Sequence, residues 1–469
     1  MKKRIAIFLL AVMLIGCLCA CAESAVTKPV TVEGAIFGGM SDDKIRTSLT
    51  FDTKWLTKEK NSRYNPELAQ FCALLSADAY FREKDYEKQR QNRVVFDELN
   101  EAEYDFTTFL TNLGFTETAH YESYLLQESP IDSNDSVTLT IGHQTVDGKY
   151  DVYAAVIRGC FSAQEWCSAF DPGCADDAYT AMTGEHPEWV NGEHFKGIDV
   201  AASRALAFID AFMKDNGDEK LPDRLLLTGH SRGGGVANLL GAHYEAEDGV
   251  TSYTYTFNSP GVTFAPDAGE YQTIFNVFDS SDFFTNAFPF AAGTFARYGT
   301  DMTTSGAEAG EAIAALKGRD DYACIPAEAA EEYRTLFAER FPSRDGLCEQ
   351  VSITRSYENA ADAEAGREAL LTLIGSEAGL GLEDLCTVGE AVKETDGSYS
   401  VTLTYCGAAL LRTYAKVMAY GEAAYDGAVS LFAEDELGCQ IATVLFENAA
   451  AINGGHLLVN SYVIAGSLK

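Results

Sequence analysis

The stretch that most constrains the fold of this chain is residues 225–240, which read LLLTGHSRGGGVANLL. Three leucines form the short apolar run of a buried parallel strand, and apolar residues at helical spacing follow. Gly229 and Gly233 flank Ser231, and glycine at both positions permits a turn so tight that a Cβ would strike the neighbouring backbone. The order strand, G-x-S-x-G, helix is typical of a nucleophile elbow and predicts that Ser231 presents its hydroxyl at the end of a sheet. The alternative is a glycine-rich turn that merely contains a serine, or that binds an anion.

Strands and helices alternate on both sides of this stretch. Continuous or alternating apolar runs predict strands, and apolar residues at three- and four-residue spacing predict helices. Further strands are expected at residues 137–141, 152–157, 253–257, 273–278 and 398–405, and further helices at 66–80, 101–113, 198–213, 307–316, 327–341 and 361–373. Asp147-Gly148 is the signal of a hairpin turn between the first two of these strands. The alternation predicts an α/β fold with a mostly parallel central sheet.

Changes in composition divide the chain into five segments. Residues 1–22 have a basic start, an apolar run and a small-residue end, which is the pattern of an export signal. Residues 23–136 are predicted to form a linker and a helical segment, and residues 137–292 the core with the elbow. Residues 293–397 are rich in alanine, glycine and glutamate, and we expect an insertion that packs over the sheet edge or covers the site. Residues 398–469 are predicted to complete the core with C-terminal helices.

Two of the three cysteines in the export signal indicate how the protein is processed. Cys17 and Cys21 each end a short sequence that resembles the lipobox of bacterial lipoproteins, and the residues around Cys21 also fit an ordinary cleavage site. We predict an extracytoplasmic protein, lipid-anchored to the membrane through Cys21, with Cys17 as the alternative, or secreted freely.

Charge and cysteine content exclude several classes of function. The chain has 35 basic and 70 acidic residues, so nucleic acid is a poor partner and electrostatic docking on anionic lipid is disfavoured. Twelve cysteines are present, and the nine outside the export signal show no metal-type C-x-x-C spacing. Cys160, Cys167 and Cys174 recur every seven residues; we interpret them as buried thiols with at most one disulfide, the alternative being a redox or metal cluster. No metal and no cofactor are predicted.

A serine hydroxyl requires a base that takes its proton. Two histidines follow Ser231 in the sequence, His243 on the predicted elbow helix and His456 on a Gly-Gly loop between helices. A loop can present an imidazole at the edge of the sheet, so elimination and chain order select His456. The alternative for His456 is an exposed loop histidine. The side chain of His230, inside the elbow, is expected to turn away from the serine hydroxyl.

An acid must orient the base, and two amides must bind the oxyanion. Asp279 and Asp282 both follow the strand at residues 273–278; Asp282 is preferred, Asp279 is the second candidate, and turn residues are the alternative for both. The amide after the nucleophile, that of Arg232, is expected to pair with the amide of Cys160 at the end of the strand at residues 152–157. The alternative at Cys160 is a plain strand-ending turn.

Several sequence blocks, in this order, resemble the lipase class 3 family of fungal-type triacylglycerol lipases and their bacterial relatives. The blocks are IRGCFSAQEW at residues 157–166, HFKGI at 194–198, GHSRGG at 229–234, YTFNSPG at 255–261, VFDSSDFF at 277–284 with Pro289, and His456 with Tyr462. The resemblance implies an α/β-hydrolase fold, carboxylic-ester hydrolysis, often on lipids, and Asp282 as the acid. The chain departs from the family pattern at Arg232, where leucine is usual, at Cys160, where Thr or Ser is usual, and in the long separation of Asp282 from His456.

We therefore predict an exported serine hydrolase that cleaves carboxylic esters, a lipase or esterase with an ester or lipid substrate. Ser231 would attack the carbonyl, His456 would act as base and then acid, and Asp282 would orient it. Alternatives are a thioesterase, acyltransferase or peptidase on the same fold, or a non-catalytic surface-binding module with a hydrolase scaffold. The sequence leaves acyl preference and oligomeric state open.

Overall fold

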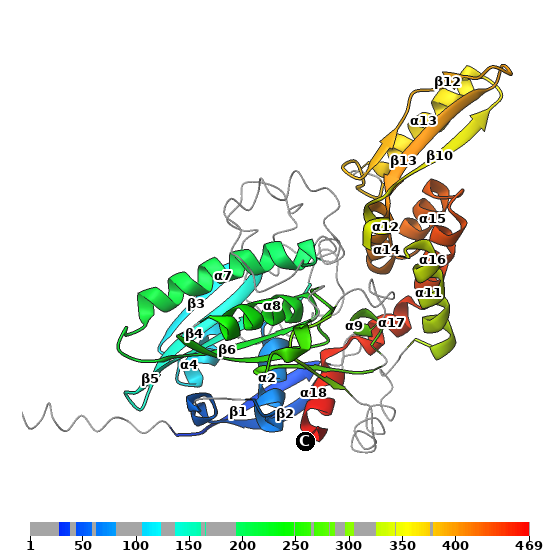
Figure 1. Ribbon diagram of the computed structural model, residues 1–469. Helices are drawn as coiled ribbons and strands as arrows, with labels where there is room; N and C mark the ends of the chain where they lie inside the picture. The colour runs from blue at the N-terminus through cyan, green and yellow to red at the C-terminus, as the bar shows by residue number, and fades with distance from the viewer. Residues whose placement is uncertain are drawn as a thin grey trace, which may run out of the picture.

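The structure of the protein is a computed structural model of all 469 residues (Figure 1). It describes residues 28–37, 44–58, 62–80, 106–122, 137–160, 165, 194–247, 249–263, 267–280, 282–286, 296–303, 325–342, 344–375 and 379–468. The predicted export signal with Cys17 and Cys21, the cysteines at 167 and 174, and the predicted helix at 307–316 lie outside these residues.

A seven-stranded sheet forms the centre of the protein. Its strands, in spatial order, are β3 (Glu117–Glu122), β4 (Thr138–Val146), β5 (Tyr150–Ile157), β6 (Asp223–His230), β7 (Val250–Phe257), β8 (Ile274–Phe278) and β9 (Thr300–Thr303). The pairs β3–β4 and β4–β5 are antiparallel, and every pair from β5 to β9 is parallel. The predicted α/β fold with a mostly parallel sheet is therefore confirmed.

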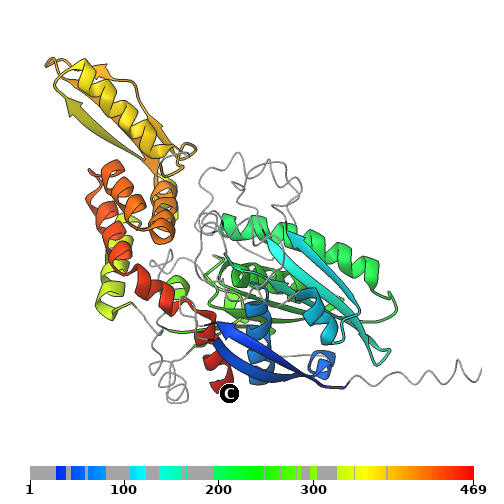
Figure 2. The same ribbon diagram turned by 180° about the vertical axis from the view of Figure 1, so that it is seen from behind.

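Helices cover both faces of this sheet (Figure 2). One face packs against α7 (Lys196–Asn216) and α8 (Arg232–Ala246), and the other against α2 (Pro66–Asp78), α4 (Phe106–Asn112) and α18 (Leu458–Ser467). Successive side chains of a strand point to opposite faces, so Val152 lies in one core and its neighbour Tyr153 in the other. A strand buried on both faces is apolar along its whole length, which is why the leucine run of β6 predicted its position.

The N-terminal segment is more regular than predicted. Residues expected to form a linker make the antiparallel hairpin of β1 (Val30–Phe37) and β2 (Lys44–Phe51), followed by the short helix η1 (Thr53–Thr57). Val32, Ile36 and Phe51 of this hairpin pack into the core beneath α2. Because β3 also pairs with the central sheet, the predicted boundary between residues 136 and 137 does not separate structural units.

A third hydrophobic core lies beside the central sheet, and we call the segment that builds most of it, residues 325–447, the satellite (Figures 1 and 2). The satellite has its own sheet, in the order β10-β13-β11, with β12 paired to β13. Its elements are α11 (Ala327–Arg340), α12 (Arg344–Cys348), β10 (Gln350–Tyr357), α13 (Ala360–Ile374), β11 (Cys386–Val388), β12 (Val392–Lys393), β13 (Tyr399–Cys406), α14 (Gly407–Tyr420), α15 (Glu422–Leu431) and α16 (Glu436–Glu447).

The satellite corrects the predicted boundary between residues 397 and 398. That boundary separates β10 from β13, although the two strands pair along their whole length, with Gln350 opposite Cys406 and Tyr357 opposite Tyr399. Helices α14 to α16 belong to the satellite core and not to the cores of the central sheet. The segment that returns to the central sheet consists of α17 (Ala449–Gly455) and α18.

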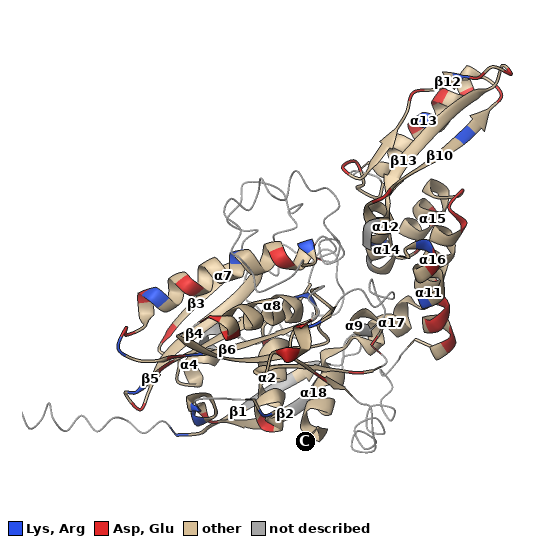
Figure 3. Ribbon diagram, in the orientation of Figure 1, with Lys and Arg blue, Asp and Glu red and all other residues tan. Residues whose placement is uncertain are grey.

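Acidic residues recur along several helices, α7, α11 and α13 among them, as Figure 3 shows. On α11, for example, Glu328, Glu331, Glu332 and Glu339 are exposed. Within the described residues, no helix combines the length and the hydrophobicity that crossing a membrane requires. Cys348 is disulfide-bonded, whereas Cys72, Cys160, Cys386, Cys406 and Cys439 carry thiols.

Candidate active site

Ser231 stands on the predicted sharp turn between β6 and α8. Its φ of 57° and ψ of −130° lie in a region that non-glycine residues rarely adopt, and the surrounding backbone holds it there. The Ser231 amide donates to the carbonyl of Phe257 (2.9 Å), and its own carbonyl accepts from the amide of Gly235 (3.0 Å). A Cβ on Gly229 would meet the carbonyl of Gly233, so these two glycines permit the close approach of strand and helix.

The structure brings Ser231, His456 and Asp282 together at one end of the sheet. Nε2 of His456 lies 2.8 Å from Oγ of Ser231, and its Nδ1 lies 3.0 and 3.1 Å from the two carboxylate oxygens of Asp282. All three side chains are buried. They come from the elbow, from the segment after β8 and from the loop between α17 and α18.

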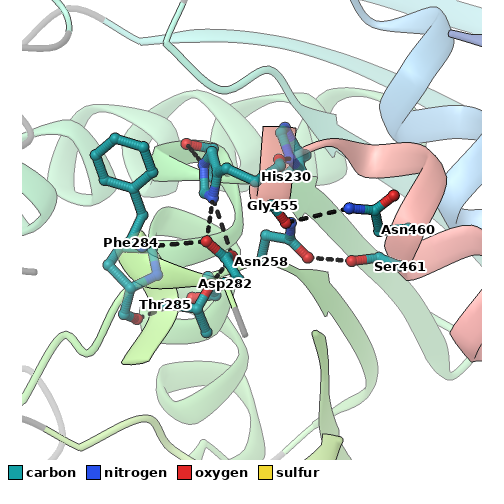
Figure 4. A network of polar contacts seen from close by, with 12 residues as sticks. His230, Asn258, Asp282, Phe284, Thr285, Gly455, Asn460 and Ser461 are labelled. Carbon is teal, nitrogen blue, oxygen red and sulfur yellow. Dashed lines mark hydrogen bonds and ion pairs between the residues drawn. The ribbon is translucent and has the colours of Figure 1, made fainter. Parts of the chain in front are cut away.

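The carboxylate of Asp282 is held in place by its own chain segment (Figure 4). It accepts from the amide of Phe284 (3.1 Å) and from the hydroxyl of Thr285, both in the short helix α9 (Phe283–Asn286). A carboxylate oriented in this way keeps the proton of the imidazole on Nδ1 and leaves Nε2 to face the serine. Asp279, the second candidate, accepts from the Asp282 amide through its backbone carbonyl (2.9 Å), so it shapes the turn that presents Asp282.

The end of β5 lies directly against Ser231. A Cβ on Gly159 would stand 3.1 Å from Cβ of Ser231, so the backbone that leads into Cys160 passes beside the serine. Cys160 is buried, and its Sγ donates to the carbonyl of Glu165 (3.3 Å). Nη2 of Arg158 contacts Oε1 of Glu165 at 2.7 Å in a buried ion pair that fixes this segment further.

Arg232, the residue after Ser231, turns its side chain toward α7 and away from the serine. Its Nη2 donates to the carbonyl of Gly197 (3.0 Å) at the start of α7, and the side chain is buried. The backbone of Arg232 therefore stays beside Ser231 while the guanidinium bonds to the neighbouring helix. The segments carrying the amides of Cys160 and Arg232, the predicted oxyanion donors, approach Ser231 from two sides.

His230 was expected to turn away from the serine hydroxyl, and its ring bonds elsewhere. Its Nε2 lies 3.1 Å from the backbone carbonyl of His456, and its Nδ1 lies 2.9 Å from the hydroxyl of Tyr80. Burial lowers the pKa of His230 to about 3, and the nearby His456 acts in the same direction. The other candidate histidine, His243, is half-buried on α8 with its ring edge-to-face against Tyr244.

Sequence reasoning missed the residues that support the site, Tyr80, Phe284, Thr285 and Asn460. Phe284 packs its ring edge-to-face on the imidazole of His456, with 4.8 Å between centroids. Phe283 packs edge-to-face on Tyr333 of the satellite, with 4.7 Å between centroids. Phe283, directly after Asp282, thus joins the satellite core, and Phe284 contacts His456. Among the described residues, no group of three or more His, Cys, Asp or Glu side chains could hold a metal ion.

The sheet order and the elbow between β6 and α8 define an α/β-hydrolase fold. No protein-family model matches the chain, and no curated protein matches its sequence. Solved structures similar to it include a triacylglycerol lipase with a serine protease triad as its catalytic centre (17% identity, 52% of this chain and 82% of that chain covered, TM-score 0.34). Two others are the Rhizomucor miehei triacylglyceride lipase (16%, 51% and 80%, 0.31) and the Lip2 lipase from Yarrowia lipolytica (15%, 41% and 69%, 0.26).

Proposed function

We propose that this protein is an extracytoplasmic serine hydrolase of the lipase and esterase type, which cleaves carboxylic esters through an acyl-enzyme. One observation carries the proposal. A serine on a strained elbow, an imidazole and a buried carboxylate form a continuous chain of hydrogen bonds at one end of a parallel sheet. In α/β-hydrolases, side chains at this end of the sheet meet the substrate.

The proposed reaction assigns one role to each group. Oγ of Ser231 attacks the ester carbonyl while Nε2 of His456 takes its proton, and Asp282 stabilises the imidazolium that forms. The amides of Cys160 and Arg232 hold the negative oxygen of the tetrahedral intermediate. The intermediate collapses when His456 returns the proton to the leaving alcohol. Water, activated by His456, then attacks the acyl group and releases the acid.

Lipid esters are the favoured substrate class, because the sequence blocks resemble those of the lipase class 3 family. The pattern of residues 1–22 supports export, with the chain either secreted or lipid-anchored through Cys21 or Cys17. The rival functions are a thioesterase, acyltransferase or peptidase on the same fold, and a non-catalytic binding module. Hydrolysis of graded p-nitrophenyl esters, thioesters and peptides by the mature protein separates them.

A fluorophosphonate probe tests the nucleophile directly. The wild type should be labelled and Ser231→Ala should not. Ser259→Ala is the matched control, because Ser259 is also buried, stands at the end of the adjacent strand β7 and uses its hydroxyl to bind the carbonyl of Pro260. Equal labelling of the wild type and Ser231→Ala would show that another residue reacts. His456→Ala should lose nearly all turnover, and near-normal rates would remove His456 from the mechanism.

A further inference from the structure

A second chain of hydrogen bonds connects Tyr80, His230 and the backbone of His456, next to the proposed triad. The hydroxyl of Tyr80, just beyond α2, contacts Nδ1 of His230 (2.9 Å), and Nε2 of His230 contacts the backbone carbonyl of His456 (3.1 Å). His230 is the residue immediately before Ser231. The chain therefore links the backbone of the nucleophile to the backbone of the base, which lies 226 positions away from His230 in the sequence.

The chemistry of the three groups determines which atom donates in each of these two hydrogen bonds. A carbonyl oxygen can only accept, so Nε2 of His230 must carry a proton. In the neutral ring Nδ1 is then an acceptor, and the hydroxyl of Tyr80 donates to it. The ring centroids of His230 and His456 are 5.1 Å apart, so a proton added to His230 would place a second positive charge beside the imidazolium of the base. The low pKa of His230 keeps that charge away.

The loop that carries His456 has other ties, but they are local (Figure 4). Nδ2 of Asn460 donates to the carbonyls of Gly454 and Gly455 (3.2 and 3.3 Å), and these residues are only six and five positions apart from it. Such bonds shape the loop against its own helix, α18. The bond from His230 differs because it holds the loop to the elbow, at the carbonyl of the catalytic histidine itself.

We propose that His230 is a positioning residue for the reaction: its Nε2–H holds the backbone of His456, and so keeps the imidazole of His456 at hydrogen-bonding distance from Ser231. Tyr80 fixes the tautomer of His230 that makes this bond. The proposal rests on the proposed function, in which His456 is the base. The bond from His230 is expected to maintain the 2.8 Å contact between Nε2 of His456 and Oγ of Ser231. A displacement of about 1 Å in such a geometry lowers turnover by about 100-fold.

The test compares three folded variants with the wild type, using p-nitrophenyl ester kinetics and the rate of fluorophosphonate labelling. His230→Leu removes the donor, and kcat and the labelling rate should fall by about 10- to 100-fold while KM stays within about twofold, because the substrate is bound elsewhere. His230→Gln offers an amide N–H near the position of Nε2 and should restore most of the loss. His243→Leu is the matched control, a histidine on α8 outside the site, and should behave as wild type.

A readout independent of substrate comes from NMR of the wild-type protein labelled at histidine. At neutral pH, His230 should appear neutral with its proton on Nε2. Tyr80→Phe should change the ¹⁵N chemical shifts of the His230 ring nitrogens. A charged His230, or one with its proton on Nδ1, would overturn the proposal even if the His230 variants failed to fold. So would a folded His230→Leu with wild-type kcat, or a folded His230→Gln that is as slow as His230→Leu. Failure of the proposed function looks different: Ser231→Ala would then be labelled as fast as the wild type.

Discussion

Phe283 connects the acid of the proposed triad to the satellite, and its removal tests whether the satellite supports catalysis. The side chain is 2% exposed, follows Asp282 directly and packs on Tyr333 of α11. Replacing a buried phenylalanine by alanine costs about 3–5 kcal/mol, because the apolar contacts are lost and a cavity remains. We expect Phe283→Ala to lower the free energy of unfolding by about that amount.

The same change should act on turnover, because the cavity lies next to the acid. Asp282 keeps its orientation through bonds to Phe284 and Thr285, which continue the chain from Phe283. If loss of the Tyr333 contact lets this segment move by about 1 Å, kcat should fall by about 100-fold with little change in KM. The measurement is ester hydrolysis at a temperature where circular dichroism shows the variant to be folded.

Phe337→Ala provides the matched control. Phe337 is also 2% exposed and also packs on Tyr333, with 5.5 Å between ring centroids, but it lies within α11 and outside the segment that carries the triad. It should lose a similar amount of stability and keep its kcat. Equal kcat values in the two variants, high or low, would refute the reasoning, because the effect would then reflect stability alone or be absent.

Three further predictions concern the acid, the elbow and the opposite end of the sheet. Asp282→Asn should lower kcat by about 10⁴-fold in ester kinetics, because an amide favours the wrong tautomer of the base. Gly233→Ala should cost about 3 kcal/mol in denaturant unfolding, because its Cβ would meet the carbonyl of Ile157. Burial and the nearby Asp151 raise the pKa of Asp223. The Asp223 carboxyl therefore binds a proton more tightly in the folded protein than in the unfolded chain, and the folded protein loses stability as the pH rises through the folded-state pKa. Asp223→Asn removes this loss, and its gain in unfolding free energy over the wild type should therefore grow from acid to neutral pH.

The parts of the site that could be predicted are those with local signals. The elbow is specified by a leucine run, two glycines and a helix within sixteen residues, and the sheet buries that run on both faces, as the pattern required. Asp282 and His456 could be selected because strand ends and loops gather at one edge of a parallel sheet. Tyr80 carries no such signal, since its partner His230 lies 150 positions away and a tyrosine at a helix end is unremarkable on its own.

The errors in the fold have the same physical origin. β10 and β13 pair and belong to one structural unit. The segments that carry them differ in amino-acid composition, and a boundary was predicted between them for that reason. The β1–β2 hairpin had a weak signal, because Ile45, Leu49 and Phe51 alternate with polar residues along β2, but Thr47 interrupts the apolar series. Strand pairing depends on contacts between distant residues, which short-range periodicity does not contain.

Helix α9, which begins directly after Asp282, contacts α17, which ends directly before His456. The chain between these two helices contains β9 of the central sheet and then the satellite. Phe283 of α9 and Ile452 of α17 both pack into the satellite core. A substitution that repacks this core would therefore reach Asp282 and His456, through residues close to them in the chain, before it disturbed the central sheet.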